Sequence, residues 1–212
     1  MHIPDAFIPI GQALGYWVIA LVFVALALRW ARRSMGEEKI PLVAVLAAGI
    51  FAIQALNIPV PGGTSGHMVG ATLAAIVLGS PYAGVFVLTL VLLVQGVIFG
   101  DGGITVMGAN IINMGVIGGF IGYYGYTAVR RLIENPYAAA FIAGWASLFL
   151  SAILCAVELA VAGTFPLVAG LTMMGIYHAI IGLIEGGITA IALYLIASAR
   201  PDILEHPLGV GA

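Results

Sequence analysis

Hydrophobic residues form long runs along the chain, and short polar or Gly/Pro-rich stretches separate each run from the next. A helix needs about 20 residues to cross a hydrocarbon core of about 30 Å, and most of the runs are close to that length. Tyr16, Trp17 and Trp30 stand at the ends of the first run, as aromatic residues do at membrane interfaces. The pattern predicts an all-α fold, a polytopic transmembrane helical bundle of seven segments, at residues 14–30, 41–56, 68–79, 82–99, 105–129, 137–162 and 168–197.

The third run, residues 68–79, is too short to span comfortably, so we expect it to be tilted, half re-entrant or set in a thinned region. Of the 212 residues 62% are hydrophobic and only 8% charged, which excludes a soluble domain of this size. The one cysteine, Cys155, lies in an apolar run and excludes a disulfide framework. We expect one transmembrane domain over residues 1–212.

The cationic residues predict the orientation of the bundle. If the N-terminus is outside, the loops at 30–40, 79–81 and 130–136 and the C-terminal tail face inward. Every cationic residue then falls on the inner side: Arg29, Arg32, Arg33, Lys39, Arg130, Arg131 and Arg200. Because inward loops are enriched in Lys and Arg, we expect a multi-pass protein of the cell (inner) membrane with a cytoplasmic C-terminus.

The first five residues, Met-His-Ile-Pro-Asp, carry the candidate chemistry. They do not resemble a signal peptide, and His2 is bulky enough to disfavour removal of the initiator Met1, so we expect the chain to start there. The Met1 amine, the His2 amide and the His2 ring can then form fused chelate rings around Ni(II) or Cu(II). A fourth ligand must come from elsewhere, and His67, at the end of the Gly/Pro-rich stretch 57–67, is the best candidate.

Each of these residues, and several other polar residues, also has an ordinary structural interpretation that involves no metal. His2 would be merely exposed at the terminus, and His67 would cap a helix or bond a loop carbonyl. Ser65 would satisfy loop backbone. Asp101 is either a turn residue or an acceptor that orients a ligand histidine, and Asp5 either holds the terminus or caps the first helix. Asn110 and Asn113 lie within one helical turn and are expected to bond between helices, with a site contact as the alternative.

Two carboxylates, Glu158 and Glu185, lie deep in apolar runs, where a charge costs about 2.5–3.5 kcal/mol on insertion scales. Glu185 follows His178 by seven residues, on the same helix face, and we expect a structural His–Glu pair or network. A proton relay is the alternative. Ala44 and Ala48 form a small-residue strip near the inner end of the second segment, where a partner helix could approach closely.

The chain resembles the NikM/CbiM family, the substrate-binding membrane components (S-components) of energy-coupling factor transporters for nickel or cobalt. The resemblance rests on motifs in order along the chain, namely Met1–Asp5, Pro61–Gly70, Phe99–Thr105, Gly108–Met114 and His178 with Glu185. It implies a six-helix S-component core with one helix added at the N-terminus. It also implies a buried N-terminus that binds the metal through the Met1 amine, the His2 amide and ring, and His67.

The resemblance further implies partners: a transmembrane coupling subunit, paired cytoplasmic ATPases and, where needed, a small accessory membrane subunit. Asp5 and the Phe99–Gly103 block look more like nickel than cobalt members, so Ni(II) is the expected substrate and Co(II) the alternative. Ala6 departs from the family, in which glycine is usual, and its methyl group is expected to crowd the terminus.

Two other classes of protein are alternatives. An intramembrane hydrolase would use Ser65 with His67 or His178, but the spacing suits no general-base pair and no G-x-S-x-G elbow is present. A proton-coupled secondary metal transporter would work through Glu158 and Glu185. Neither explains the Met-His terminus. The chain has no Walker A loop, so energy for uptake is expected to come from partners, and we predict no enzymatic activity.

Overall fold

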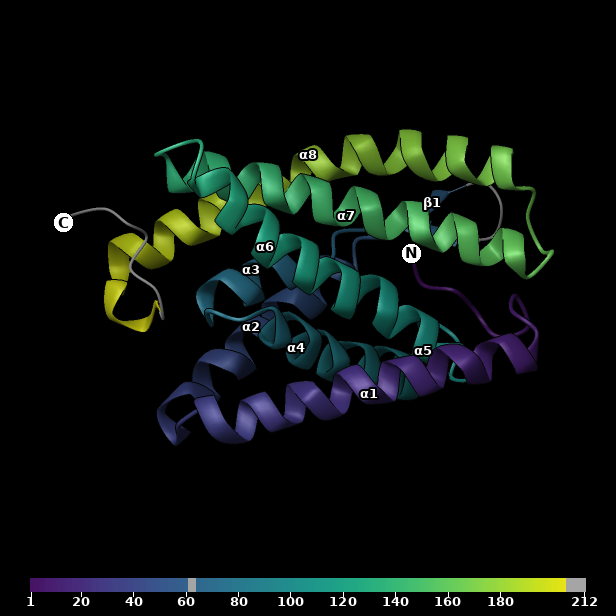
Figure 1. The fold of residues 1–212 in the computed structure, drawn as a ribbon, viewed down its shortest axis with the longest axis horizontal. Coiled ribbons are helices and arrows are strands. Elements are labelled where there is room, and N and C mark those ends of the chain that lie inside the picture. The colour runs from purple at the N-terminus through teal and green to yellow at the C-terminus, as the bar shows by residue number, and fades with distance from the viewer. Residues whose placement is uncertain (61–63, 205–212) are drawn as a thin grey trace.

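The computed structural model describes residues 1–60 and 64–204. These ranges are almost entirely helical (Figure 1). The α-helices are α1 (Ile10–Ser34), α2 (Ile40–Gln54), α3 (Ala71–Val77), α4 (Pro81–Val94), α5 (Met107–Asn110), α6 (Gly118–Arg130), α7 (Pro136–Val161) and α8 (Leu167–Ala199). Two π-helical stretches, η2 (Gln95–Phe99) and η3 (Ile111–Ile117), and two 3₁₀ turns, η1 (Glu37–Lys39) and η4 (Pro201–Ile203), complete the helical elements.

The seven predicted segments are confirmed. The fourth is α4 continued by η2, and the fifth is an unbroken helical stretch in which η3 joins α5 to α6. Among the described residues, four helices are long and apolar enough to cross a membrane: Ile10–Ser34, Pro81–Phe99, Pro136–Val161 and Leu167–Ala199. Large apolar side chains stay exposed along α1 and α8, as lipid-facing helices require.

The third segment is short, as predicted. Helix α3 has only seven residues, and every one of them is buried. At a rise of about 1.5 Å per residue it covers about a third of a hydrocarbon core. It lies inside the bundle, beside α4 and α6, and glycines permit the approach. A Cβ on Gly122 of α6 would overlap Thr72 of α3, so only glycine fits there.

The Gly/Pro-rich stretch folds into a hairpin that sequence did not predict. Strands β1 (Ile58–Val60) and β2 (Thr64–Gly66) pair antiparallel, with Ile58 opposite Gly66. The turn at 61–63 lies outside the described residues, as does His206. Strand β2 lies against α8, because a Cβ on Gly66 would meet the side chain of Ile181. The hairpin thereby delivers His67 to the interior of the bundle.

Small residues also let the last two long helices pack closely. A Cβ added at Gly182 of α8 would lie 2.8 Å from Cδ1 of Trp145, and one at Gly186 would press on the backbone of Phe141, both on α7. The Trp145 indole donates to the carbonyl of Ala179 at 2.9 Å and fixes the register of the two helices. The pattern of small residues along α8 therefore serves packing within the bundle.

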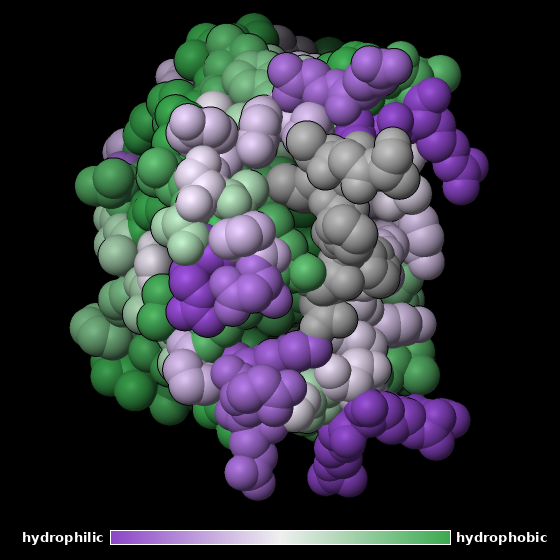
Figure 2. All heavy atoms as spheres, turned by 90° about the vertical axis from the view of Figure 1, so that its left-hand side faces the viewer, coloured by the Kyte–Doolittle hydropathy of each residue, from purple (hydrophilic) through white to green (hydrophobic). Residues whose placement is uncertain are grey.

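Cationic residues gather at one end of the molecule. They lie in the last turns of α1 and α6, in the η1 turn and just after the end of α8, all at the left of Figure 1. Figure 2 looks onto that end and shows hydrophilic residues across it, with hydrophobic residues along the flanks. The sequence predicts that the cationic residues share one side of the bundle, and this grouping agrees with that prediction. The N-terminal peptide enters the bundle away from this end (Figure 1).

Candidate metal centre

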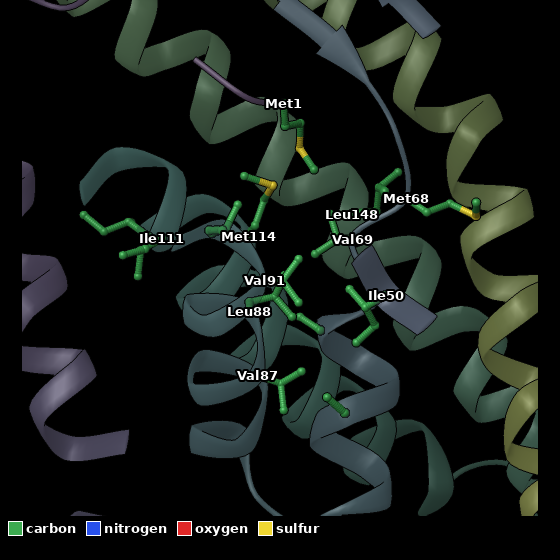
Figure 3. Close-up of a cluster of buried hydrophobic side chains, with 14 of the residues drawn as sticks. Met1, Ile50, Met68, Val69, Val87, Leu88, Val91, Ile111, Met114 and Leu148 are labelled. Atoms are coloured by element: carbon green, nitrogen blue, oxygen red, sulfur yellow. The ribbon is translucent and has the colours of Figure 1, made fainter. Parts of the chain in front are cut away.

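The N-terminus is buried in the bundle. Met1 is 0% exposed, and its side chain points into a cluster that includes Met114, Val69 and Leu148 (Figure 3). The α-amine donates to the carbonyl of Ser65 and, at 3.3 Å, to the Ser65 hydroxyl. The main-chain amine of the first residue is thus held next to the segment that carries His67.

Residues 3–5 anchor the terminal peptide to the 101–110 region. The Asn110 amide brackets Ile3, accepting from its N–H at 2.9 Å and donating to its carbonyl at 3.2 Å. Asp5 accepts from the N–H of Thr105 at 2.8 Å and from its hydroxyl at 2.5 Å. The Thr105 hydroxyl holds the pKa of Asp5 below its ordinary value, so Asp5 is a carboxylate at neutral pH.

Asp5 therefore holds the terminus. The alternative, that it caps α1, is wrong, because α1 begins at Ile10 after Pro9 without a side-chain cap. Gly102 and Gly103 make room for the inserted peptide. A Cβ on Gly103 would overlap the backbone of Asp5, and one on Gly102, which has φ of 89°, would lie 3.1 Å from the His2 ring.

Ala6 has φ of 70°, in the left-handed region that glycine adopts without penalty. Its side chain is exposed, so the expected crowding by its methyl group is wrong. The cost of alanine at this position is backbone strain of about 1–2 kcal/mol. This accounts for the preference for glycine that the resemblance implies.

His2 is 4% exposed, and two polar side chains face its ring. Its Nε2 lies 3.1 Å from Oε1 of Gln95, which can only accept, so Nε2 carries the proton and Nδ1 the lone pair. Nδ1 lies 3.4 Å from a carboxylate oxygen of Asp101. Gln95 opens the π-helical stretch η2, and such insertions are frequent at functional sites because they turn a side chain out of helical register. Nδ1 is also the ring nitrogen that is placed to form a chelate ring with the His2 amide.

His67 is 1% exposed and presents its other ring nitrogen. Its Nδ1 donates to the carbonyl of Met68 at 2.7 Å, which fixes the tautomer. Its Nε2 is buried and has no hydrogen-bond partner within residues 1–60 and 64–204. Buried polar atoms without partners are uncommon and mark a functional group or an unseen ligand. The interpretation that His67 bonds a loop carbonyl is therefore correct for Nδ1, but it gives no role to Nε2.

The His2 and His67 rings stack, with centroids 4.5 Å apart and planes at 22°. Among the described residues, no three His, Cys, Asp or Glu side chains come close enough to hold a metal. The arrangement is instead a set of nitrogens, two from the main chain and two from imidazoles. Such a set can bind a divalent cation that accepts an ionised amide.

Burial disfavours the protonated forms of the Met1 amine, the His2 ring and the His67 ring. It lowers the pKa of the Met1 amine from 8.0 to about 5, against weaker opposing effects of Cys155 and Asp101. Burial also lowers the pKa of His2, aided by the nearby amine, and that of His67 well below 6.5. All three nitrogens are therefore mostly unprotonated at neutral pH.

The structure does not bring the buried carboxylates into this centre. Glu158 accepts from the Asn113 amide at 2.6 Å, so Asn113 bonds between helices as expected. The predicted pairing of His178 with Glu185 is wrong. His178 donates from Nδ1 to the carbonyl of Met174 on its own helix, and Glu185 accepts from two backbone N–H groups instead. A shared helix face did not imply a contact, because a seven-residue spacing spans two turns.

Sequence reasoning missed three residues of the centre. They are Gln95, which orients His2, Thr105, which holds Asp5, and Gln54, which bonds the segment after His67. The two glutamines carried a signal, since each is an uncharged polar residue inside an apolar run and each is buried in the structure. Thr105 carried none beyond its place beside the Gly102–Gly103 pair.

Comparison with known proteins identifies the family of this chain. Residues 2–203 match the family described as cobalt uptake substrate-specific transmembrane region. A protein of Archaeoglobus fulgidus provisionally named a fused nickel transport protein (NikMN) is 43% identical over the whole chain, which covers 70% of that relative. The cobalt transport protein CbiM of Sorangium cellulosum is 35% identical over 97% of this chain and 95% of its own.

A solved structure has the same fold. The crystal structure of a truncated transition metal transporter superposes with a TM-score of 0.89 at 31% identity, covering 93% of this chain and 99% of that one. The matches are to transport proteins and not to enzymes. The chain belongs to the CbiM family and is a substrate-specific membrane component of nickel or cobalt transport.

Proposed function

We propose that this chain is the S-component of an energy-coupling factor importer and that it binds Ni(II) through four nitrogens. These are the Met1 amine, the His2 amide, His2 Nδ1 and His67 Nε2. The observation that carries the proposal is the burial of a main-chain amine beside two stacked imidazoles, one of which has a buried Nε2 without a partner among the described residues. Ser65, Asn110 and Asp5 hold the terminal peptide in place, and the Asp101 carboxylate lies beside His2 Nδ1.

The donor set favours Ni(II). Four nitrogens around an ionised amide suit a metal that prefers square-planar geometry, which Ni(II) and Cu(II) do and Zn(II) does not. Co(II) gains less from a planar field and is the second candidate, in line with a relative named for cobalt. Competition between metals for the purified protein should therefore rank Cu(II) and Ni(II) above Co(II) and Zn(II).

Metal binding should weaken on acidification by about tenfold per pH unit between pH 6 and 8. With the amine pKa at about 5 and both imidazole pKa values lowered, the amine and rings are already unprotonated there, so only the His2 amide releases a proton. Below about pH 5 the dependence steepens as the amine is protonated. Calorimetry in buffers of different ionisation enthalpy measures the number of protons released. Two or more protons at pH 7 would mean an exposed terminus with ordinary pKa values.

The proposal places the metal site on the outer side of the cell membrane, with the C-terminus in the cytoplasm. The grouping of cationic residues at the opposite end supports this orientation. Energy is supplied by a transmembrane coupling subunit and paired ATPases. The fused relative, which is longer than this chain, supports an additional accessory membrane subunit. We propose that residues 1–212 form one transmembrane domain.

Ala44 and Ala48 are proposed to contact the coupling subunit. Both are exposed on the outward face of α2, so they do not pack within the bundle. Ala48 also lines an apolar cavity of about 310 Å³ between α2 and α4, together with Phe51 and Leu90. Small residues beside an apolar cavity let a second helix approach closely.

Replacing Ala44 and Ala48 together with Leu should leave metal binding intact and abolish assembly with the partners. Pull-down of the coupling subunit and a metal-binding isotherm on the same sample measure the two effects. Ala25→Leu, at an exposed position of α1, is the matched control. Normal assembly of the double variant would remove these residues from the interface.

Reconstitution tests the transport mechanism. Vesicles that contain this chain alone should not accumulate Ni(II), whereas vesicles that also contain the coupling subunit and ATPases should do so with ATP. A proton-coupled secondary transporter would instead accumulate metal under a pH gradient without partners. In the structure Glu158 and Glu185 each bond neutral donors, Asn113 and two backbone amides, and do not form a relay with each other.

A further inference from the structure

Side chains from other helices form hydrogen bonds with the backbone of the segment that carries His67. Residues 67–70 lie between β2 and α3. Apart from the Gly70 carbonyl, which accepts from the N–H of Ala74, no strand or helix among the described residues pairs their backbone groups. His67, Met68 and Val69 are nevertheless buried. Buried backbone groups need partners, which here must come from side chains.

Two long polar side chains from different helices supply them. Glu185 of α8 accepts from the N–H of Val69 at 3.0 Å through one carboxylate oxygen and from the N–H of Gly70 at 2.8 Å through the other. Gln54 of α2 donates to the carbonyl of Val69 at 2.8 Å. Glu185 is 2% and Gln54 0% exposed. The Val69 backbone is therefore held on one side by α8 and on the other by α2.

The backbone is shaped for this carboxylate. Gly70 has φ of 76°, and a left-handed residue turns successive N–H groups toward one point, which makes a small anion-binding concavity. Ile181, one turn before Glu185 on α8, contacts the same segment at Gly66. Helix α8 thus follows the segment on both sides of His67, at Gly66 and at Val69–Gly70.

We propose that Glu185 is a positioning residue for metal binding: through Val69 and Gly70 it fixes the backbone that aims His67 Nε2 at the N-terminal chelate. Gln54 supports it from the opposite side. This inference rests on the proposed function, because it gives Glu185 a role through His67. Glu185 touches no metal in this account, and both of its carboxylate oxygens serve as acceptors for the backbone.

The test uses Glu185→Gln in the full chain with its native N-terminus. The carboxamide keeps the shape but offers one acceptor oxygen and turns an NH₂ group toward the second N–H. We expect Ni(II) affinity to fall by about tenfold to hundredfold, the range for residues that orient ligands. With Cu(II) as the probe, the electron paramagnetic resonance spectrum should move from four nitrogen ligands toward three, as in His67→Ala.

A double-mutant cycle separates this role from a merely structural one. If Glu185 acts through His67, its substitution should have no further effect on affinity in the His67→Ala background. Glu158→Gln is the matched control, a carboxylate with the same 2% exposure that bonds Asn113 on a different helix pair, and it should leave the Cu(II) spectrum unchanged.

The outcomes are distinct. A Glu185→Gln protein with a lower melting temperature but an unchanged four-nitrogen spectrum would overturn the inference and leave the proposed function standing. Additive losses in the cycle would overturn it as well. If His67→Ala binds Ni(II) with normal affinity, His67 is not a ligand and the proposed function itself is contradicted. Should Glu185→Gln not fold, Gln54→Ala weakens the same segment from α2 and is expected to shift the spectrum in the same direction.

Discussion

Adding a single residue before Met1, or leaving its amine formylated, should abolish metal binding. Either change turns the primary amine into an amide and removes one ring of the proposed chelate. Burial adds a second penalty, since Met1 is 0% exposed and its amine already contacts Ser65, so an extra residue has no space. Loss of the amine removes a ligand outright, so the decrease in Ni(II) affinity should exceed the roughly hundredfold typical of changes in the surrounding shell.

The measurement is equilibrium dialysis of Ni(II) against protein with a native or an extended N-terminus. The same residue added at the C-terminus is the control and should have no effect. A protein that carries an N-terminal tag and retains full nickel affinity would rule out the amine as a ligand.

His67→Ala and His2→Ala should each reduce Ni(II) affinity by more than about a hundredfold, because each removes a ligand and not a residue that orients one. His178→Ala is the matched control. His178 is also fully buried and also donates from Nδ1 to a backbone carbonyl, and its Nε2 likewise has no partner in the described part of the chain. It is not close enough to His2 and His67 to make a three-residue metal cluster within the part of the chain that the structure describes.

Titration of the three variants with Ni(II), together with their melting temperatures, distinguishes the roles. We expect His178→Ala to keep its affinity even if it loses stability. An equal loss of affinity in His178→Ala and His67→Ala would mean that burial of an imidazole, and not coordination by His67, determines binding.

The sequence was sufficient to predict the helical segments and the short third one, because lipid imposes a length and a polarity that are visible residue by residue. It also pointed to Met1, His2 and His67, since the chelate rings are local at the terminus. The sequence leaves open whether Asp5 anchors the terminal peptide and whether Asn110 contacts it. Both questions are decided by tertiary contacts between residues about a hundred positions apart.

Other features depended on geometry that no local pattern encodes. The π-helical stretch η2 directs Gln95 to His2, and a regular helix would aim it elsewhere. Glu185 was assigned to His178 because the two share a helix face, but the left-handed backbone at Gly70 offers it two N–H groups instead. Long-range pairing of buried polar groups is decided by which helices meet, and hydropathy does not contain that information.

The most direct test of the central claim is the optical and magnetic character of the Ni(II) complex formed by protein with a native N-terminus. Four in-plane nitrogens, one an ionised amide, should give a yellow, diamagnetic, square-planar complex at a ratio of one Ni(II) per chain. A paramagnetic complex with an octahedral or tetrahedral spectrum would contradict the account, because it would show that the Met1 amine, His2 and His67 do not together form the ligand set.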